Sequence, residues 1–142
     1  MLETPLTMRA LEIAEHAHAG QVDKGGTPYI EHPKHVAACM HTEMETCAAL
    51  LHDVVEDTSV TLDDLRGAGM PDAVVDAVAL LTHDDDTPYL DYVRALKPNP
   101  IARAVKLADL AHNSDLSRNP HPTPADIARL EKYARARVIL EE

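Results

Sequence analysis

Along most of this chain, apolar residues recur at intervals of three and four, which places them on one face of an α-helix. In the N-terminal segment these residues are Leu6, Ala10, Ile13, Ala14 and Ala17, and Gly20 follows as a stop signal. No long stretch alternates apolar and polar residues as a half-buried strand does. The pattern therefore predicts an all-α fold.

Capping signals divide the helical pattern into segments. Thr4-Pro5, Thr87-Pro88 and Thr123-Pro124 each precede such a pattern, with Thr suited to the N-cap and Pro to the first helical position. Thr27-Pro28 instead falls in a glycine-containing loop over 20–31. We expect about eight helices in one compact domain over residues 1–142, at 5–17, 33–41, 43–57, 61–67, 71–81, 88–98, 100–113 and 124 onward.

Composition supports the helical prediction and excludes some function classes. Apolar residues make up 45% of the 142 residues and aromatic residues only 3%, which suits close helix packing better than a sheet. The net charge of −11, with no basic patch, argues against nucleic acid and anionic membranes as partners. No apolar run is long enough to span a bilayer, and the N-terminus lacks a signal-peptide pattern, so we expect a cytoplasmic protein.

The stretch 50–58 sets four ionisable side chains among apolar residues. On a continuous helix, His52 pairs with Glu56 and Asp53 pairs with Asp57, each one turn apart. Desolvation and repulsion would make this group costly without a counter-charge. A divalent cation removes that cost, whereas the alternative is a solvated helix face carrying a chance His-Asp pair.

Two further segments carry ionisable residues in unusual places. His32 precedes the helix-starting Pro33, which would hold its ring at a helix N-terminus, although such a residue can also be a simple cap or surface side chain. In the segment 106–113, Lys106, Asp109 and Asn113 fall within about 60° of one another on a helix. An ordinary amphipathic helix with a polar stripe is the alternative there.

The residues His32, His52, Asp53 and Asp109 together offer two imidazoles and two carboxylates. Such mixed nitrogen and oxygen ligation suits Mn²⁺, Fe²⁺ or Zn²⁺ in a site with open positions. A bound cation would lower the pKa of a water molecule and polarise a phosphoryl oxygen. Lys106, one turn from Asp109, could then neutralise charge on the phosphate, the alternative being a surface lysine.

Three strings, "GQVDKGGTPYIEHP", "LLHDVVEDT" and "VKLADLAHN", occur in this order. Their combination resembles the HD-superfamily hydrolase domain of RelA/SpoT-type enzymes and small alarmone hydrolases, over most of residues 8–118. The resemblance implies a compact all-α HD domain that uses Mn²⁺ to remove the 3′-pyrophosphate from (p)ppGpp. It also assigns roles by position: metal ligands at His32, His52, Asp53 and Asp109, water activation at Glu56 and Asp57, and substrate contacts at Lys24, Tyr29 and Asn113.

The chain departs from that family at two positions. Asp23 stands where the family usually carries an Arg that packs on guanine, and Asp115 stands where an Arg commonly follows the Asn. Each change replaces a cation with an anion, which should weaken polyphosphate binding unless other cations compensate. The candidates for compensation are Lys24, Lys34, Arg103, Lys106 and Arg118.

The resemblance thus favours a ppGpp 3′-pyrophosphohydrolase. The first alternative is an HD phosphohydrolase for another nucleotide or cofactor, such as an NADPH phosphatase or a nucleotidase, and the second is a non-catalytic nucleotide-binding regulatory module. Of the remaining histidines, His35 could approach the site from one turn beyond His32, whereas the others, including His112, are expected to be structural or exposed. The run Asp84 to Asp86 is expected to form a turn.

Overall fold

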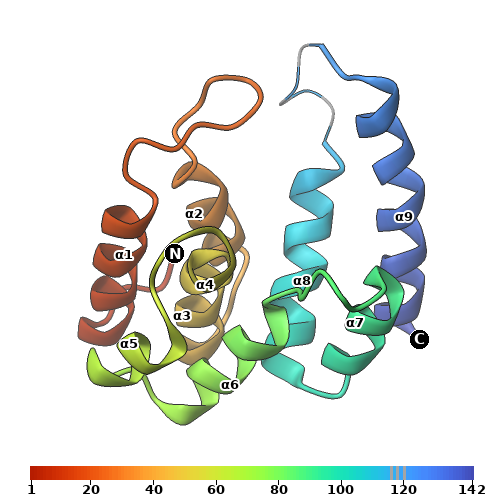
Figure 1. Cartoon of the computed structure of the whole chain (residues 1–142). Coiled ribbons are helices and arrows are strands. Elements are labelled where there is room, and N and C mark those ends of the chain that lie inside the picture. The colour runs from red at the N-terminus through yellow and green to blue at the C-terminus, as the bar shows by residue number, and fades with distance from the viewer. Residues whose placement is uncertain (116, 118, 120) are drawn as a thin grey trace.

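In the computed structural model, residues 1–115, 117, 119 and 121–142 are described, and they form nine helices with one isolated β-bridge between Val22 and Pro28 (Figure 1). The helices are α1 (Pro5–Ala17), α2 (Glu31–Ala38), α3 (Glu43–Leu51), α4 (Val54–Asp57), α5 (Leu62–Gly67), α6 (Asp72–Leu81), α7 (Tyr89–Leu96), α8 (Pro100–Asn113) and α9 (Pro124–Glu141). The predicted all-α fold is confirmed. No helix within the described ranges is both long and apolar enough to cross a membrane.

Two of the three predicted Thr-Pro caps, Thr4 and Thr123, are confirmed, and Thr61 caps α5 in the same way. Thr4, Thr61 and Thr123 each form a capping box. The threonine side chain accepts a hydrogen bond from the backbone N–H three residues later, and the side chain of that later residue accepts one from the backbone N–H of the threonine. Thr87 does not cap a helix, because α7 begins after Pro88 without a side-chain capping bond. The segment before it is the expected turn, since the Asp84 carboxylate accepts the backbone N–H of Asp86 at 2.9 Å.

The prediction of one continuous helix over 43–57 is wrong. Helix α3 ends at Leu51, and α4 starts at Val54 after two turn residues, His52 and Asp53. The backbone of Asp53, at φ −103° and ψ −3°, departs from the ideal α-helical angles. His52 contributes to the ending, because its Nδ1 donates to the carbonyl of Ala49 in the last turn at 2.6 Å.

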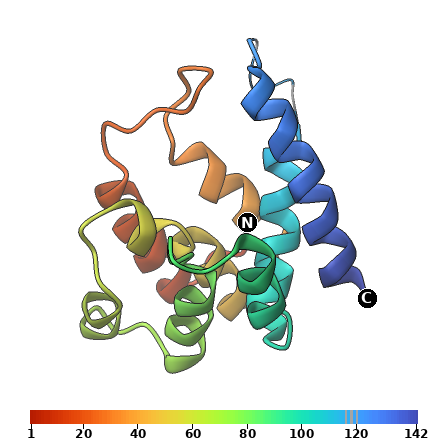
Figure 2. The same ribbon diagram turned by 45° about the vertical axis from the view of Figure 1, so that its right-hand side comes forward.

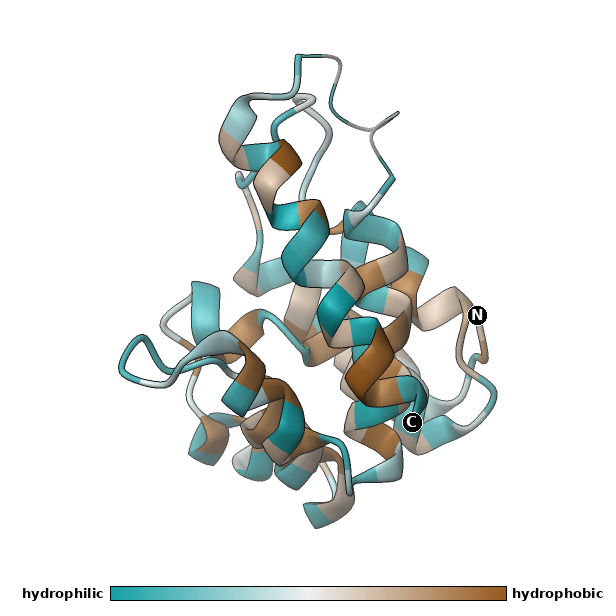
Figure 3. Ribbon diagram, turned by 90° about the vertical axis from the view of Figure 1, so that its right-hand side faces the viewer, coloured by the Kyte–Doolittle hydropathy of each residue, from teal (hydrophilic) through white to brown (hydrophobic). Residues whose placement is uncertain are grey.

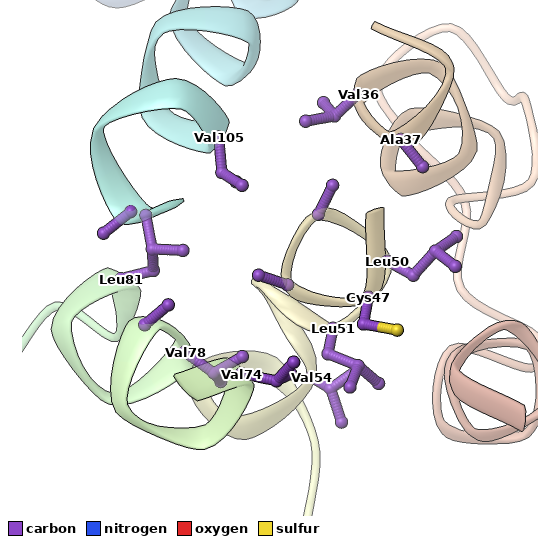
Figure 4. Close-up of a cluster of buried hydrophobic side chains, with 14 of the residues drawn as sticks. Val36, Ala37, Cys47, Leu50, Leu51, Val54, Val74, Val78, Leu81 and Val105 are labelled. Atoms are coloured by element: carbon purple, nitrogen blue, oxygen red, sulfur yellow. The ribbon is translucent and has the colours of Figure 1, made fainter. Parts of the chain in front are cut away.

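The core is centred on α3, which packs against α1, α2, α6 and α8. Figure 4 shows Leu51 and Val54 meeting Val74 and Val78 of α6, while Val105 of α8 closes another side. All five side chains are fully buried. Small and branched residues fill this core closely, and burial of each Leu or Val contributes roughly 1.5–3 kcal/mol relative to exposure.

Two long connections, 18–30 between α1 and α2 and 114–123 between α8 and α9, leave and rejoin the helices at the same end of the molecule (Figures 1 and 2). Helix α9 packs against α7 and α8. It carries a mixture of hydrophilic and hydrophobic residues (Figure 3), and of these Asp126, Ala136 and Leu140 are buried. This arrangement brings both connections beside the N-terminus of α2 and the C-terminus of α8.

Candidate metal centre

Three of the four predicted metal ligands form one buried group. His32 comes from the first turn of α2, His52 follows α3, and Asp109 lies in α8. Their relative exposures are 3%, 2% and 5%, and their candidate ligand atoms all lie within 4.8 Å of one another. Asp109 Oδ1 is 2.9 Å from Nε2 of His32 and 3.4 Å from Nε2 of His52. The two imidazoles therefore present the same ring atom to one carboxylate.

Asp53 joins this group from the turn between α3 and α4. Its Oδ2 lies 3.1 Å from Nε2 of His52 and 3.8 Å from Nε2 of His32. The same oxygen accepts a hydrogen bond from the hydroxyl group of Tyr29, with an O···O distance of 2.5 Å. The structure thus brings all four predicted ligands together.

The donor geometry at His52 fits a bound cation. Its Nδ1 donates to the carbonyl of Ala49, so the neutral ring carries its lone pair on Nε2. That buried atom has no hydrogen-bond partner in the described part of the chain, although it faces the carboxylates of Asp53 and Asp109. A lone pair directed at anionic oxygens is unfavourable unless a positive charge, either a metal ion or a second ring proton, lies between them. Burial alone would lower the pKa of His52, but the two carboxylates outweigh it and raise that pKa.

Glu56 and Asp57 lie beside this group on α4. Together with Asp53 they form a second group whose carboxylate oxygens are within 4.8 Å of one another. Burial, followed by the charges of neighbouring carboxylates, raises the pKa of both Glu56 and Asp57. The Glu56 carboxylate also accepts the backbone N–H of His83 at 2.6 Å. Both side chains are exposed at the edge of the group, and the neighbouring carboxylates favour their holding a proton.

Two predicted substrate contacts bond directly to Asp109. Lys106 Nζ donates to Asp109 Oδ2 at 2.9 Å, and Asn113 Nδ2 donates to Oδ1 at 3.0 Å. Burial alone would lower the pKa of Lys106, but Asp109 outweighs it and keeps that pKa above its ordinary value. The Lys106 ammonium also lies 5.5 Å from the ring centre of Tyr89 and 5.2 Å from that of Tyr92. Lys106 is therefore a permanent cation in the wall of the site.

Two adjoining pockets give access to the centre. One, of about 260 Å³, is lined by Asp53, Glu56, Asp57 and Asp109 among others. The other, of about 320 Å³, lies under the two long connections. Both are lined by Tyr29, Asn113, Arg129 and Tyr133. Because they share these walls, the pockets form one cleft that passes the candidate metal centre.

Lys24 and the two family departures line the second pocket. Lys24 forms a salt bridge with Asp126 near the start of α9. This ion pair joins the segment between α1 and α2 to the last helix. Asp23 organises its own loop, since its Oδ1 accepts the N–H groups of Gly25 and Thr27 at 2.9 and 3.0 Å. Asp115 lines the same pocket, whereas Arg118 lies outside the described residues.

Sequence reasoning missed the contribution of α9 to the cleft. Arg129 lines both pockets, and Lys132 lines the one beside the carboxylates. The Lys132 ammonium lies 4.6 Å from the ring centre of Tyr89. Spacings of three and four between Arg129, Lys132 and Tyr133 indicate a shared helix face, but nothing in the sequence shows which face meets α7 and α8.

The fold and site together define an all-α protein with carboxylates placed beside a His/His/Asp group that could hold a metal ion. Residues 10–99 match the family described as HD domain, and the chain belongs to this family. Membership implies a divalent metal, and the His32, His52 and Asp109 group is a set of side chains that could hold one. The predicted family resemblance is confirmed.

Individual relatives and a solved structure give more specific similarities than the family match. The chain is 36% identical to mouse "Guanosine-3′,5′-bis(diphosphate) 3′-pyrophosphohydrolase MESH1", over 92% of this chain and 80% of the relative. It is 35% identical to the "Probable GTP pyrophosphokinase" of Mycobacterium leprae, but spans only 18% of that protein. A solved structure described as "A metazoan ortholog of SpoT hydrolyzes ppGpp and plays a role in starvation responses" superimposes with a TM-score of 0.76 and 30% identity, covering 97% of this chain and 86% of the other.

Proposed function

We propose that this chain, acting as a single HD-type domain, hydrolyses guanosine 3′,5′-bis(diphosphate) to release the 3′-pyrophosphate, with Mn²⁺ as its metal. The geometric observation that supports the proposal most directly is the convergence of Nε2 of His32 and Nε2 of His52 on Asp109, with Asp53 beside them. The activity in the mouse relative's name, and the ppGpp hydrolysis ascribed to the metazoan protein of the solved structure, support the same reaction.

His32, His52, Asp53 and Asp109 would hold the metal, which when bound supplies positive charge to the reacting phosphoryl group. Glu56 acts as the general base, because burial and then the neighbouring carboxylates raise its pKa, which makes it a stronger proton acceptor than an ordinary carboxylate. It takes a proton from a water whose oxygen bonds to the phosphorus on ribose O3′. The bond from that phosphorus to O3′ breaks, O3′ gains a proton, and pyrophosphate leaves. Asp57 orients the water.

The cations of the cleft bind the phosphates in this proposal. Lys106 lies against Asp109, and Arg129 and Lys132 face the same pocket from α9. Lys24, Tyr29 and Asn113 line the adjoining pocket, where the nucleoside would bind. The substrate is thus a small nucleotide, consistent with an expected cytoplasmic location.

A second candidate is hydrolysis of a different phosphorylated nucleotide or cofactor. Asp23, Asp115 and Asp126 all line the 320 Å³ pocket, so its walls carry several carboxylates. Such walls disfavour additional phosphate groups on the bound nucleoside. This observation favours a substrate with less negative charge than a guanosine bis(diphosphate).

A substrate screen separates these candidates. Purified, metal-free protein is reloaded with Mn²⁺ and incubated with ppGpp, pppGpp, ppApp, NADPH and nucleoside monophosphates, and the products are resolved by anion-exchange chromatography. We expect GDP and pyrophosphate from ppGpp. A matched Glu56→Gln sample identifies any contaminating phosphatase.

Each other outcome has a defined meaning. Orthophosphate from NADPH or a monophosphate, with ppGpp left intact, would establish the second candidate instead. No product from any compound, despite bound metal, would indicate a non-catalytic nucleotide-binding module.

A further inference from the structure

His112 makes an unusual contact with a candidate metal ligand. The Nδ1 atoms of His112 and His32 lie 2.7 Å apart, within hydrogen-bond distance. Their ring planes differ by only 3°, with ring centres 5.0 Å apart. An N–H···N bond between imidazoles lies in the plane of both rings, and the parallel planes seen here are compatible with such a bond. His32 is therefore contacted through Nε2 by Asp109 and through Nδ1 by His112.

Only one hydrogen fits between two ring nitrogens 2.7 Å apart. In a pair of neutral imidazoles, one nitrogen donates and the other accepts. If Nε2 of His32 gives its lone pair to a metal, the ring proton must be on Nδ1. Nδ1 then donates to Nδ1 of His112, whose own proton lies on Nε2. With a metal on Nε2, His112 is therefore the acceptor that holds His32 in the tautomer able to bind the cation.

Helix packing holds His112 in this position. It follows Asp109 by three residues on α8, while His35 follows His32 by three residues on α2. The ring of His35 stacks on that of His112, with centres 3.8 Å apart and planes 10° apart. The face-to-face contact between α2 and α8 therefore limits rotation of the His112 ring.

We propose that His112 is a positioning residue for the metal centre, accepting the Nδ1 proton of His32 so that Nε2 is directed at the cation. The inference rests on the metal site of the proposed function. His52 is held in the same tautomer by a backbone carbonyl, so the two ligand histidines are oriented by different partners. Metal-bound histidines commonly depend on such a partner, and its loss typically weakens metal affinity or activity about 10–100-fold.

His112 also lies outside the two pockets in which the substrate is proposed to bind. It lines a 460 Å³ surface pocket with His32 and His35, but it does not line either pocket of the catalytic cleft. A change at this position therefore acts through His32 rather than through direct contact with the substrate.

Two substitutions at His112 distinguish loss of the hydrogen-bond acceptor from loss of the aromatic ring. His112→Phe keeps a ring to stack on His35 but removes the acceptor, whereas His112→Asn can place its carbonyl oxygen where Nδ1 was. We expect His112→Phe to raise the Mn²⁺ dissociation constant about 10–100-fold, and His112→Asn to restore most of the affinity. Free Mn²⁺ is measured by electron paramagnetic resonance. The matched control is His41→Phe, the same change at an exposed histidine, which should bind Mn²⁺ as the wild type does.

A spectroscopic measurement tests the tautomer without any variant. Long-range ¹H–¹⁵N correlation spectra of the Zn²⁺-loaded wild type should show a protonated Nδ1 on His32 and an unprotonated Nδ1 on His112. A protonated Nδ1 on His112 would overturn the inference, as would wild-type Mn²⁺ affinity in folded His112→Phe. Failure of the wild type to bind any divalent metal would instead refute the metal site itself.

Discussion

Binding of a divalent metal should stabilise this fold, and Asp109→Asn should abolish the stabilisation. The candidate ligands come from α2, the turn after α3, and α8, three parts of the chain that the cation would connect. A ligand that binds only the folded state adds about 2.7 kcal/mol at 100 times its dissociation constant. For a domain of this size, about 4 °C per kcal/mol gives a rise in Tm of about 10 °C.

The variant is chosen because Asp109 is the shared centre of the site. Its Oδ1 lies near both imidazoles, and Asn keeps the shape while removing the charge. Each protein is compared with its own metal-free form, so any change in intrinsic stability cancels. The matched control is Asp63→Asn on α5, where the side chain is 93% exposed.

Thermal unfolding is followed by circular dichroism at the helical band, in EDTA and over a Mn²⁺ titration. The wild type and Asp63→Asn should show the full rise in Tm, and Asp109→Asn little or none. An equal rise in Asp109→Asn, or no rise in the wild type at millimolar Mn²⁺, would show that this group of side chains is not a metal site.

Three further outcomes follow from individual contacts. Glu56→Gln should lower the single-turnover rate by about 10² or more while Mn²⁺ content by emission spectrometry is unchanged; full activity would exclude Glu56 as the base. Burial and then the neighbouring carboxylates raise the pKa of Glu56, so its contribution to metal-free stability is present below the unfolded pKa and is lost as pH rises through the folded pKa. The Tm of Glu56→Gln in EDTA, relative to wild type, should therefore increase as the pH rises above the ordinary range of a carboxyl group, and a constant difference would contradict this. Tyr92→Phe removes a 2.8 Å hydrogen bond to the carbonyl of Leu81 and should cost about 1–3 kcal/mol in urea unfolding, because that buried carbonyl loses its partner; an unchanged midpoint would show that water replaces the hydroxyl.

Local chemistry explains which parts of the fold were predictable. The capping boxes at Thr4, Thr61 and Thr123 depend on residues three positions apart, so the sequence contains the whole interaction. The buried stripe of α6 follows from apolar spacing alone. The break at His52 was not predictable by the same rules, because the flanking residues keep a helical pattern while the His52 side chain bonds the carbonyl of Ala49.

The sequence by itself determined most of the helices, the caps at Thr4, Thr61 and Thr123, and the residue types able to hold a metal, since these depend on neighbours within one or two turns. Only the tertiary structure decided that His32 meets Asp109 from 77 positions away, that His112 contacts His32, and that α9 brings Arg129 and Lys132 to the cleft. These contacts depend on how α2, α8 and α9 cross, and crossing is set by side-chain packing between distant segments, which helical periodicity does not specify.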